Sequence, residues 1–130
     1  MRMNKYFVLA LALVAPAAHG ADDCAVAPSH SEQRACLEKL AATTAAEVVL
    51  VQSDMSKRIA HLDDEAAVKN NMLMHFLSAT EQFHRYRTTQ CEFEASAAAG
   101  GNGAGDLRSR CEVRLNREYV ARLKKPLGLL

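Results

Sequence analysis

Two long stretches of the chain carry hydrophobic or small residues at intervals of three or four, with polar and charged residues between them. In the first stretch, from about residue 29 to 62, the repeating positions are Leu37, Leu40, Thr44, Val48, Val51, Met55, Ile59 and Leu62. In the second, from about residue 64 to 98, they are Met72, Phe76, Ala79, Phe83, Tyr86, Gln90 and Phe93. Such intervals place side chains on one face of an α-helix, and the alternation of four and three in the second stretch is typical of a coiled-coil seam. The pattern predicts two long helices with these stripes in the core.

Local signals predict where the helices begin and end. Ser29 and Glu32 fit a capping box, and the acidic segment Asp63-Asp64-Glu65 suits a break before the next helix. The segment Gly100-Gly101-Asn102-Gly103-Ala104-Gly105 predicts a loop, because glycine loses much backbone entropy in a helix. We expect Asp106 to N-cap a third helix that ends before Pro126 and buries Leu107, Cys111, Leu115, Tyr119 and Leu123.

These elements predict an all-α fold for residues 21–130. It is a single domain, a three-helix bundle made of a long antiparallel hairpin and a shorter third helix. Residues 1–20 read instead as a cleaved secretory signal peptide. Arg2 and Lys5 precede an apolar run that is too short to span a bilayer, and small residues end at Gly20. The sequence therefore predicts an exported protein.

Removing that signal changes the charge. Without Arg2 and Lys5, 14 basic residues face 15 acidic ones, a net charge of −1 with histidine neutral. This balance argues against a strongly basic nucleic-acid binder. No second apolar stretch of about 18 residues follows, so we expect no membrane anchor after cleavage. A core with no tryptophan and few aromatic residues needs another source of stability.

Cysteine pairing is the expected source. Cys24, Cys36, Cys91 and Cys111 form an even set without a Cys-x-x-Cys pair, which favours two disulfides over a zinc site. The favoured pairing is Cys24–Cys36 with Cys91–Cys111, because Cys91 and Cys111 come level in a hairpin around the glycine loop. Each closed loop would stabilise the fold by about 3 kcal/mol. Cys24–Cys91 with Cys36–Cys111 remains the alternative.

Charge is divided unevenly along the chain. Residues 21–66 hold nine acidic and four basic residues, a net of −5, and residues 67–130 hold six acidic and ten basic residues, a net of +4. The simpler interpretation is that the two halves pair within the bundle. The functional interpretation is that an acidic patch attracts a basic partner.

Nothing in the sequence predicts an enzyme. It has no HExxH motif and no nucleophile elbow. His75 and His84 are nine residues apart and face opposite sides of a helix, and all four cysteines are expected to be bonded. A chance metal pair of His61 with His75 is less expected than solvated side chains. We therefore expect neither a catalytic residue, a metal site nor a cofactor.

The segment Phe83-His84-Arg85-Tyr86-Arg87-Thr88-Thr89-Gln90-Cys91, the pair Gly100-Gly101, and Cys111 before a helix with Arg117 and Leu123 together resemble a known pattern. They are similar to the lysozyme inhibitor LprI-like family of exported bacterial domains, over about residues 23–123. That family usually has Trp where this chain has Phe83. The resemblance implies a small helical, disulfide-bonded domain of the cell envelope, periplasmic or secreted. It implies that Phe83, Tyr86, Arg87 and Arg117 form a structural signature.

Two functions follow as hypotheses. The first is an envelope binding protein that inhibits a lysozyme-like muramidase by steric occlusion. Its contacts would come from Asp63, Asp64 and Glu65, and from the loop residues Gly100, Gly101, Asn102 and Gly103. The second is a structural or accessory periplasmic protein that binds another envelope component through the basic third helix. The basic residues of that helix are Arg108, Arg110, Arg114, Arg117, Arg122, Lys124 and Lys125.

Overall fold

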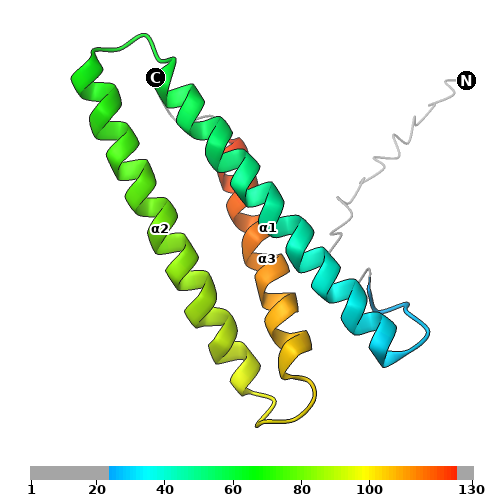
Figure 1. Cartoon of the computed structure of the whole chain (residues 1–130). Coiled ribbons are helices and arrows are strands. Elements are labelled where there is room, and N and C mark those ends of the chain that lie inside the picture. Colours follow the sequence, from blue (N-terminus) through cyan, green and yellow to red (C-terminus); the bar gives the residue numbers. More distant parts are fainter. Residues whose placement is uncertain (1–23, 126–130) are drawn as a thin grey trace, which may run out of the picture.

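The computed structural model describes residues 24–125, and it confirms the all-α prediction. Helices α1 (His30–Ala60), α2 (Ala66–Ser96) and α3 (Ala104–Lys124) run up, down and up, so that α1 and α2 form the long hairpin (Figure 1). No strand occurs within residues 24–125, and none of the helices there is long and apolar enough to cross a membrane. The signal peptide predicted for residues 1–20 lies outside the described residues.

Helix α1 begins where the capping box predicts. The Glu32 backbone N–H donates to the Ser29 hydroxyl at 3.3 Å, and that hydroxyl donates to the Glu32 carboxylate at 2.6 Å. These bonds satisfy one of the free N–H groups of the first turn and hold the two side chains together. Lys57 and Arg58 lie in the last turn, where positive charge is favoured by the helix dipole.

Helix α3 begins earlier than expected. The predicted N-cap, Asp106, is wrong, because the helix starts at Ala104 with Gly103 as its N-cap, which makes no side-chain capping bond. Asp106 lies inside the first turn and is buried. Its carboxylate accepts hydrogen bonds from His30 and Arg34 of α1 instead of capping its own helix. Tertiary contacts therefore use a side chain that local rules would assign to a cap.

The core lies mainly between α1 and α3. Most of the stripe predicted for α1 is buried or half-buried, including Leu37, Val48, Met55 and Ile59. Helix α3 has two inward faces, since it packs against both other helices. On the predicted face Cys111 and Leu115 are buried, but Leu107 is exposed, so its predicted burial is wrong. A second buried face, which the sequence did not predict, carries Val113, Asn116 and Val120.

The stripe predicted for α2 is only partly correct. Phe76 and Phe83 are half-buried, but Tyr86 is 55% exposed and Phe93 is 70% exposed. The fully buried residues of α2 are Cys91 and Ala95. At 3.6 residues per turn, Tyr86 and Phe93 lie about 60° and 80° round the helix from Phe83. Helix α2 packs mostly on α3 and little on α1, so its buried face is too narrow to reach them.

Both predicted disulfides are present. Cys24 is bonded to Cys36 with their Cα atoms 5.7 Å apart, and Cys91 to Cys111 with theirs 5.4 Å apart. The first bond joins the segment before α1 to that helix, and the second joins α2 to α3 near the glycine loop. The alternative pairing of Cys24 with Cys91 is therefore wrong. Two disulfides are typical of proteins that fold in an oxidising compartment.

Candidate partner-binding surfaces

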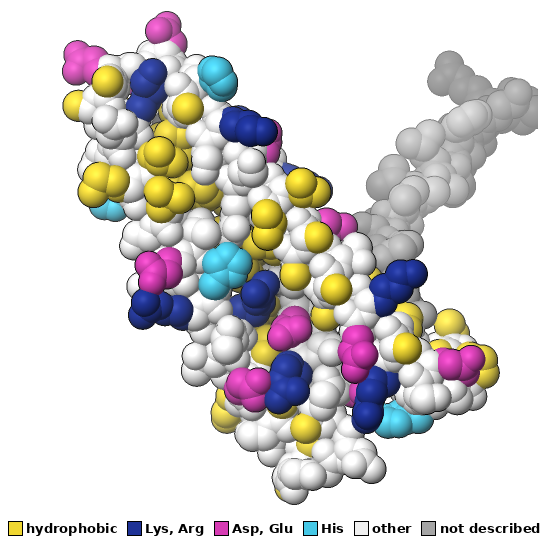
Figure 2. Space-filling model, in the orientation of Figure 1, with side chains coloured by type: hydrophobic (Ala, Val, Ile, Leu, Met, Phe, Trp, Pro, Cys, Tyr) yellow, Lys and Arg dark blue, Asp and Glu magenta, His cyan; other side chains and the backbone are white. Residues whose placement is uncertain are grey.

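The acidic segment Asp63-Asp64-Glu65 forms the turn between α1 and α2. All three side chains are exposed, and within residues 24–125 none of them takes part in an ion pair. Figure 2 shows acidic side chains at this extremity of the molecule. We call residues 63–65 the acidic tip. It presents three carboxylates without a compensating cation bound to them.

The glycine loop is more constrained than its composition suggests. The Arg34 guanidinium donates to the Asn102 carbonyl oxygen at 2.7 Å, which ties the loop to α1. Ala99 and Gly100 have φ angles of +48° and +79°, so the chain leaves α2 through two successive left-handed residues. The Gly101 N–H donates to the Ala98 carbonyl oxygen at 2.8 Å. This loop is held in one shape by three separate features of the fold.

The acidic tip and the glycine loop lie at opposite ends of the bundle, because one precedes α2 and the other follows it (Figure 1). A helix of 31 residues, the length of α2, spans about 46 Å. One narrow cleft in a partner can therefore hold either the acidic tip or the glycine loop, but not both at once. The structure does not bring the two predicted contact segments together.

Phe83 and Arg87, two of the signature residues, meet α3 at the centre of the bundle. The Phe83 ring stacks on the ring of Tyr119, with the centroids 3.8 Å apart and the planes 8° apart. The Arg87 guanidinium lies 5.7 Å from the centroid of the Phe83 ring and donates to the Asn116 side-chain oxygen at 2.7 Å. Both residues are therefore used inside the fold, where they attach α2 to α3.

The other two signature residues are placed differently. Tyr86 is exposed on the flank of α2, and Arg117 is half-buried on α3. The tyrosine side chain is thus available to a partner, although the sequence analysis assigned it to the core. Phe93 is exposed two turns further along the same flank.

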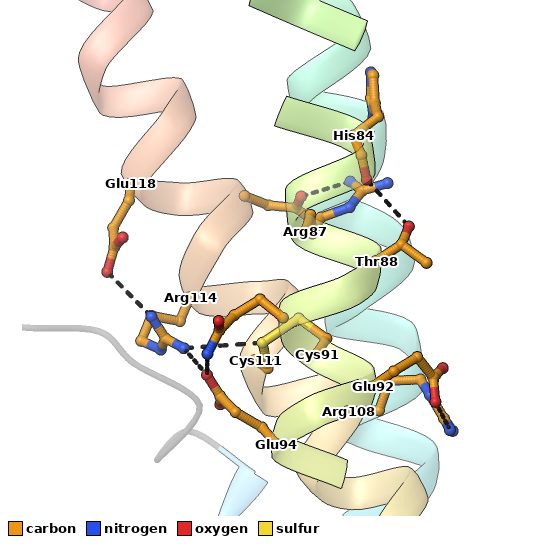
Figure 3. Close-up of a disulfide and its surroundings, with 12 residues drawn as sticks. His84, Arg87, Thr88, Cys91, Glu92, Glu94, Arg108, Cys111, Arg114 and Glu118 are labelled. Carbon is orange, nitrogen blue, oxygen red and sulfur yellow. Dashed lines mark hydrogen bonds and ion pairs between the residues drawn. A yellow bond between two sulfur atoms is a disulfide. The ribbon is translucent and has the colours of Figure 1, made fainter. Parts of the chain in front are cut away.

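Ion pairs between α2 and α3 flank the Cys91–Cys111 bond on both sides (Figure 3). Arg108 donates to both oxygens of the Glu92 carboxylate, at 2.7 and 2.9 Å, and these hydrogen bonds lower the pKa of Glu92. Arg114 donates to the Glu94 carboxylate at 2.6 Å. The pKa of Glu94 is lowered by the hydrogen bond from Gln90 and by Arg114. Two of the basic residues of α3 are therefore engaged within the bundle.

The ion pairs do not follow the division of charge predicted from the sequence. Among residues 24–125, the ion pair that joins the two halves sets Asp106 of the basic half against Arg34 of the acidic half at 3.3 Å. His30 of the acidic half is hydrogen-bonded to the same carboxylate at 2.8 Å. This group could not be predicted from the sequence, because Asp106 is 76 residues from His30 and 72 from Arg34, and no motif links them. Most of the acidic charge of α1 consequently remains on the surface.

A second polar group lies between the helices. The Gln52 amide is 3.3 Å from the His84 Nε2 atom and 3.5 Å from the Tyr119 hydroxyl, which is 3.3 Å from the Thr80 hydroxyl. Burial, and then the nearby charge of Arg87, lower the pKa of His84. This group contains no carboxylate. Its geometry is that of a hydrogen-bonded contact between helices rather than of a proton-transfer pair.

No group of three or more potential metal ligands occurs among the described residues. No protein-family model, curated protein or solved structure matches this chain, and its resemblance to the LprI-like family stays a prediction. The surfaces that the structure offers to a partner are therefore described by their own chemistry. They are the acidic tip, the C-terminal end of α3 with the exposed residues Arg122, Lys124 and Lys125, and the side of α2 that exposes Tyr86 and Phe93.

Proposed function

We propose that this chain is an exported binding protein of the bacterial cell envelope that inhibits a lysozyme-like muramidase by inserting the acidic tip into its cleft. The observation that carries the proposal is the position of Asp63, Asp64 and Glu65. They are three exposed carboxylates at the end of a long helical hairpin, where two helices meet in a narrow turn. A projecting turn of this kind fits a cleft better than a flat face does.

Electrostatics supports a basic target. The three carboxylates lie within three successive residues and are not neutralised by ion pairs inside the described chain. Concentrated charge of one sign accelerates the encounter with a partner of the opposite sign, and it does so more at low salt. Muramidases of the lysozyme type are commonly basic, so the tip would be attracted towards them. Inhibition would then be steric, with no bond made or broken.

The disulfides support a role outside the cytoplasm. Cys24–Cys36 and Cys91–Cys111 are of the kind that persists in the periplasm or in secreted proteins. A binding protein with this role needs neither a cofactor nor a metal. The glycine loop, tied to α1 by Arg34, is assigned a structural role in this proposal.

A lysozyme turbidity assay on bacterial cell walls tests the proposal. We expect the purified protein to slow clearing, and the variant Asp63→Asn/Asp64→Asn/Glu65→Gln to slow it much less. The matched control is Glu38→Gln/Glu47→Gln/Asp54→Asn, which removes the same charge from exposed positions on the side of α1. If both variants inhibit equally weakly, the net charge and not the tip is responsible for inhibition. No inhibition of several lysozyme types by micromolar protein would reject the proposal.

A specific observation favours one alternative, a structural or accessory protein that binds another envelope component. Arg122, Lys124 and Lys125 are exposed and adjacent at the end of α3. Together with Glu118 and Ala121, two of them line a shallow depression of about 560 Å³. The surface is basic and suits an acidic partner. Arg108 and Arg114 do not line this depression; they lie nearer the start of α3 and pair with Glu92 and Glu94.

Pull-down from a purified envelope fraction separates the two functions. We expect an acidic partner of α3 to be lost with Arg122→Gln/Lys125→Gln and kept with the neutralised acidic tip. The reverse pattern supports the first proposal. Arg122 and Lys125 suit this experiment better than Arg114, since replacing Arg114 also removes its ion pair with Glu94.

A further inference from the structure

Helix α2 carries a second stripe that does not face the core of the bundle. Eight positions alternate at intervals of four and three along one flank, and none of them is Asp, Glu, Lys or Arg. They are Val68, Met72, His75, Ala79, Gln82, Tyr86, Thr89 and Phe93. The acidic, lysine and arginine residues of α2 all lie off this line. We call these eight positions the flank stripe.

The flank stripe is open to solvent. Met72 is half-buried and the other seven side chains are exposed, with Val68 at 50%, Tyr86 at 55% and Phe93 at 70%. Figure 1 shows α2 at one edge of the bundle, with α1 and α3 to one side of it. Exposed aromatic side chains in a continuous line without Asp, Glu, Lys or Arg are unusual on a monomer and mark interaction surfaces.

The spacing indicates the kind of partner. Alternating intervals of four and three are the a and d positions of a heptad repeat, which pack against another helix with the same period. The repeat extends over 26 residues, or about 39 Å. We propose that the flank stripe binds the flank stripe of a second copy of this chain. The two α2 helices would lie antiparallel about a two-fold axis.

The antiparallel arrangement makes the two stripes complementary in size. Centred between Ala79 and Gln82, it sets Phe93 against the partner's Val68 and Tyr86 against the partner's His75. Large side chains then meet smaller ones, and each contact occurs twice, as a two-fold interface requires. Because the stripe contains no Asp, Glu, Lys or Arg, the interface buries no carboxylate, ammonium or guanidinium group without a partner.

Charge favours the antiparallel arrangement over the parallel one. Parallel helices would bring the two acidic tips side by side, six carboxylates in one place, which is strongly repulsive. Antiparallel helices separate the tips by about the length of α2, which is several times the screening distance of about 8 Å at physiological salt. Both tips then remain exposed at opposite ends of the dimer.

The size of the stripe suits a dimer of modest affinity. With side chains of about 150–250 Å², Tyr86 and Phe93 together expose on the order of 250 Å² in each copy. The other six side chains bring the total towards the lower limit of specific interfaces, about 1,000 Å². We expect dissociation to be measurable in the micromolar range.

Sedimentation velocity over a wide concentration range tests the dimer. We expect the wild-type mass to rise from monomer to dimer between about 1 and several hundred micromolar. Phe93→Glu should stay monomeric with an unchanged circular dichroism spectrum. The matched control is Leu50→Glu on α1, because Leu50 is 68% exposed and lies off the stripe. A wild-type protein that is monomeric at 1 mM, or a dimer that Phe93→Glu leaves intact, overturns the proposal.

A mixing experiment tests the antiparallel arrangement. Val68→Lys and Phe93→Glu should each be monomeric alone, since each places a charge within the interface. In the antiparallel register the two substituted positions face one another, so an equimolar mixture should regain a heterodimer. The mixture should lose that heterodimer at high salt. A mixture that stays monomeric while the wild type dimerises overturns the antiparallel register.

Discussion

Arg87 of α2 donates a hydrogen bond of 2.7 Å to Asn116 of α3, a side chain that is 1% exposed. The amide nitrogen of the same asparagine donates to the hydroxyl of Thr44 on α1 at 3.1 Å. That hydroxyl in turn donates to the Ala41 carbonyl oxygen at 3.1 Å. Asn116 therefore connects all three helices, and no buried side-chain polar atom among the described residues lacks a partner.

Removing this connection should destabilise the bundle. Asn116→Ala removes the hydrogen bond from the half-buried Arg87 and the one to Thr44, whose hydroxyl keeps its bond to Ala41. A hydrogen bond to a charged group contributes about 1.5–3 kcal/mol and a neutral one about 0.5–1.5 kcal/mol. We expect a total loss of about 2–3 kcal/mol in the free energy of unfolding, measured by urea denaturation. A double-mutant cycle with Thr44→Val should give a coupling energy of about 1 kcal/mol. Additive effects of the two substitutions would show that the hydrogen bond between Asn116 and Thr44 contributes nothing to stability.

Phe83 and Tyr86 are three residues apart on α2, but truncating Phe83 should lower the stability of the fold much more than truncating Tyr86. Phe83 stacks on Tyr119, so Phe83→Ala should cost about 2 kcal/mol. Tyr86 is mostly exposed, so Tyr86→Ala should change stability by less than about 0.5 kcal/mol. Thermal unfolding at low micromolar concentration compares them without a contribution from association. Equal losses would mean that Tyr86 belongs to the core after all.

This contrast shows how far sequence pattern determines the fold here. Repeats of three and four predicted the long helices, and the hairpin geometry predicted the Cys91–Cys111 bond correctly. The pattern could not resolve which side of the aromatic stripe of α2 faces inward. Residues 60–80° apart on one helix share the same periodicity, and the neighbouring helix decides which of them is covered. Tyr86 and Phe93 were assigned to the core for that reason.

The polar contacts were less predictable than the apolar ones. Asp106 looked like an N-cap because a glycine segment precedes it, yet it binds His30 and Arg34 from the other end of the chain. Asn116 gave no sequence signal, because one polar residue on an apolar helix face is equally compatible with a solvated position. Contacts over 70 residues or more depend on how helices are arranged, and that arrangement has no local code.

The two disulfides should differ in their resistance to reduction. Cys91 and Cys111 are each 1% exposed, whereas Cys36 is only half-buried. Thiol–disulfide exchange requires access to a sulfur atom, so a mild reductant should open Cys24–Cys36 first. Timed alkylation followed by mass mapping should label Cys24 and Cys36 before the other pair. Simultaneous labelling of all four would indicate that reduction proceeds through global unfolding.

Loss of the second disulfide should be costly. Cys91 and Cys111 are separated by 20 residues, so the bond should contribute about 3 kcal/mol by restricting the unfolded chain. Cys91→Ala/Cys111→Ala should therefore lower the free energy of unfolding by about that amount while Cys24–Cys36 stays intact. Urea denaturation under non-reducing conditions measures the loss. A change below about 1 kcal/mol would mean that the ion pairs flanking the bond hold α2 and α3 together without it.

His84 should make the protein less stable as the pH falls from 7.5 to 5. Its pKa in the folded state is lowered, by burial and by the charge of Arg87, below the value of about 6.5 expected in the unfolded chain. In this range the unfolded state therefore binds the proton more readily, and protonation shifts the equilibrium towards unfolding. The contribution of neutral His84 is complete above pH 6.5 and is lost as the pH falls through the folded-state pKa. Glu92 and Glu94 titrate below this range, since their pKa values are lowered from 4.5.

Urea denaturation at several pH values between 5 and 7.5 measures this effect. The slope of unfolding free energy against pH should decrease in His84→Gln, which keeps a polar side chain beside Gln52. His75→Gln is the matched control, because His75 is an exposed histidine of the same helix. An NMR titration of the imidazole protons should place the midpoint of His84 below 6.5. A slope that His84→Gln leaves intact would assign the pH dependence to another group.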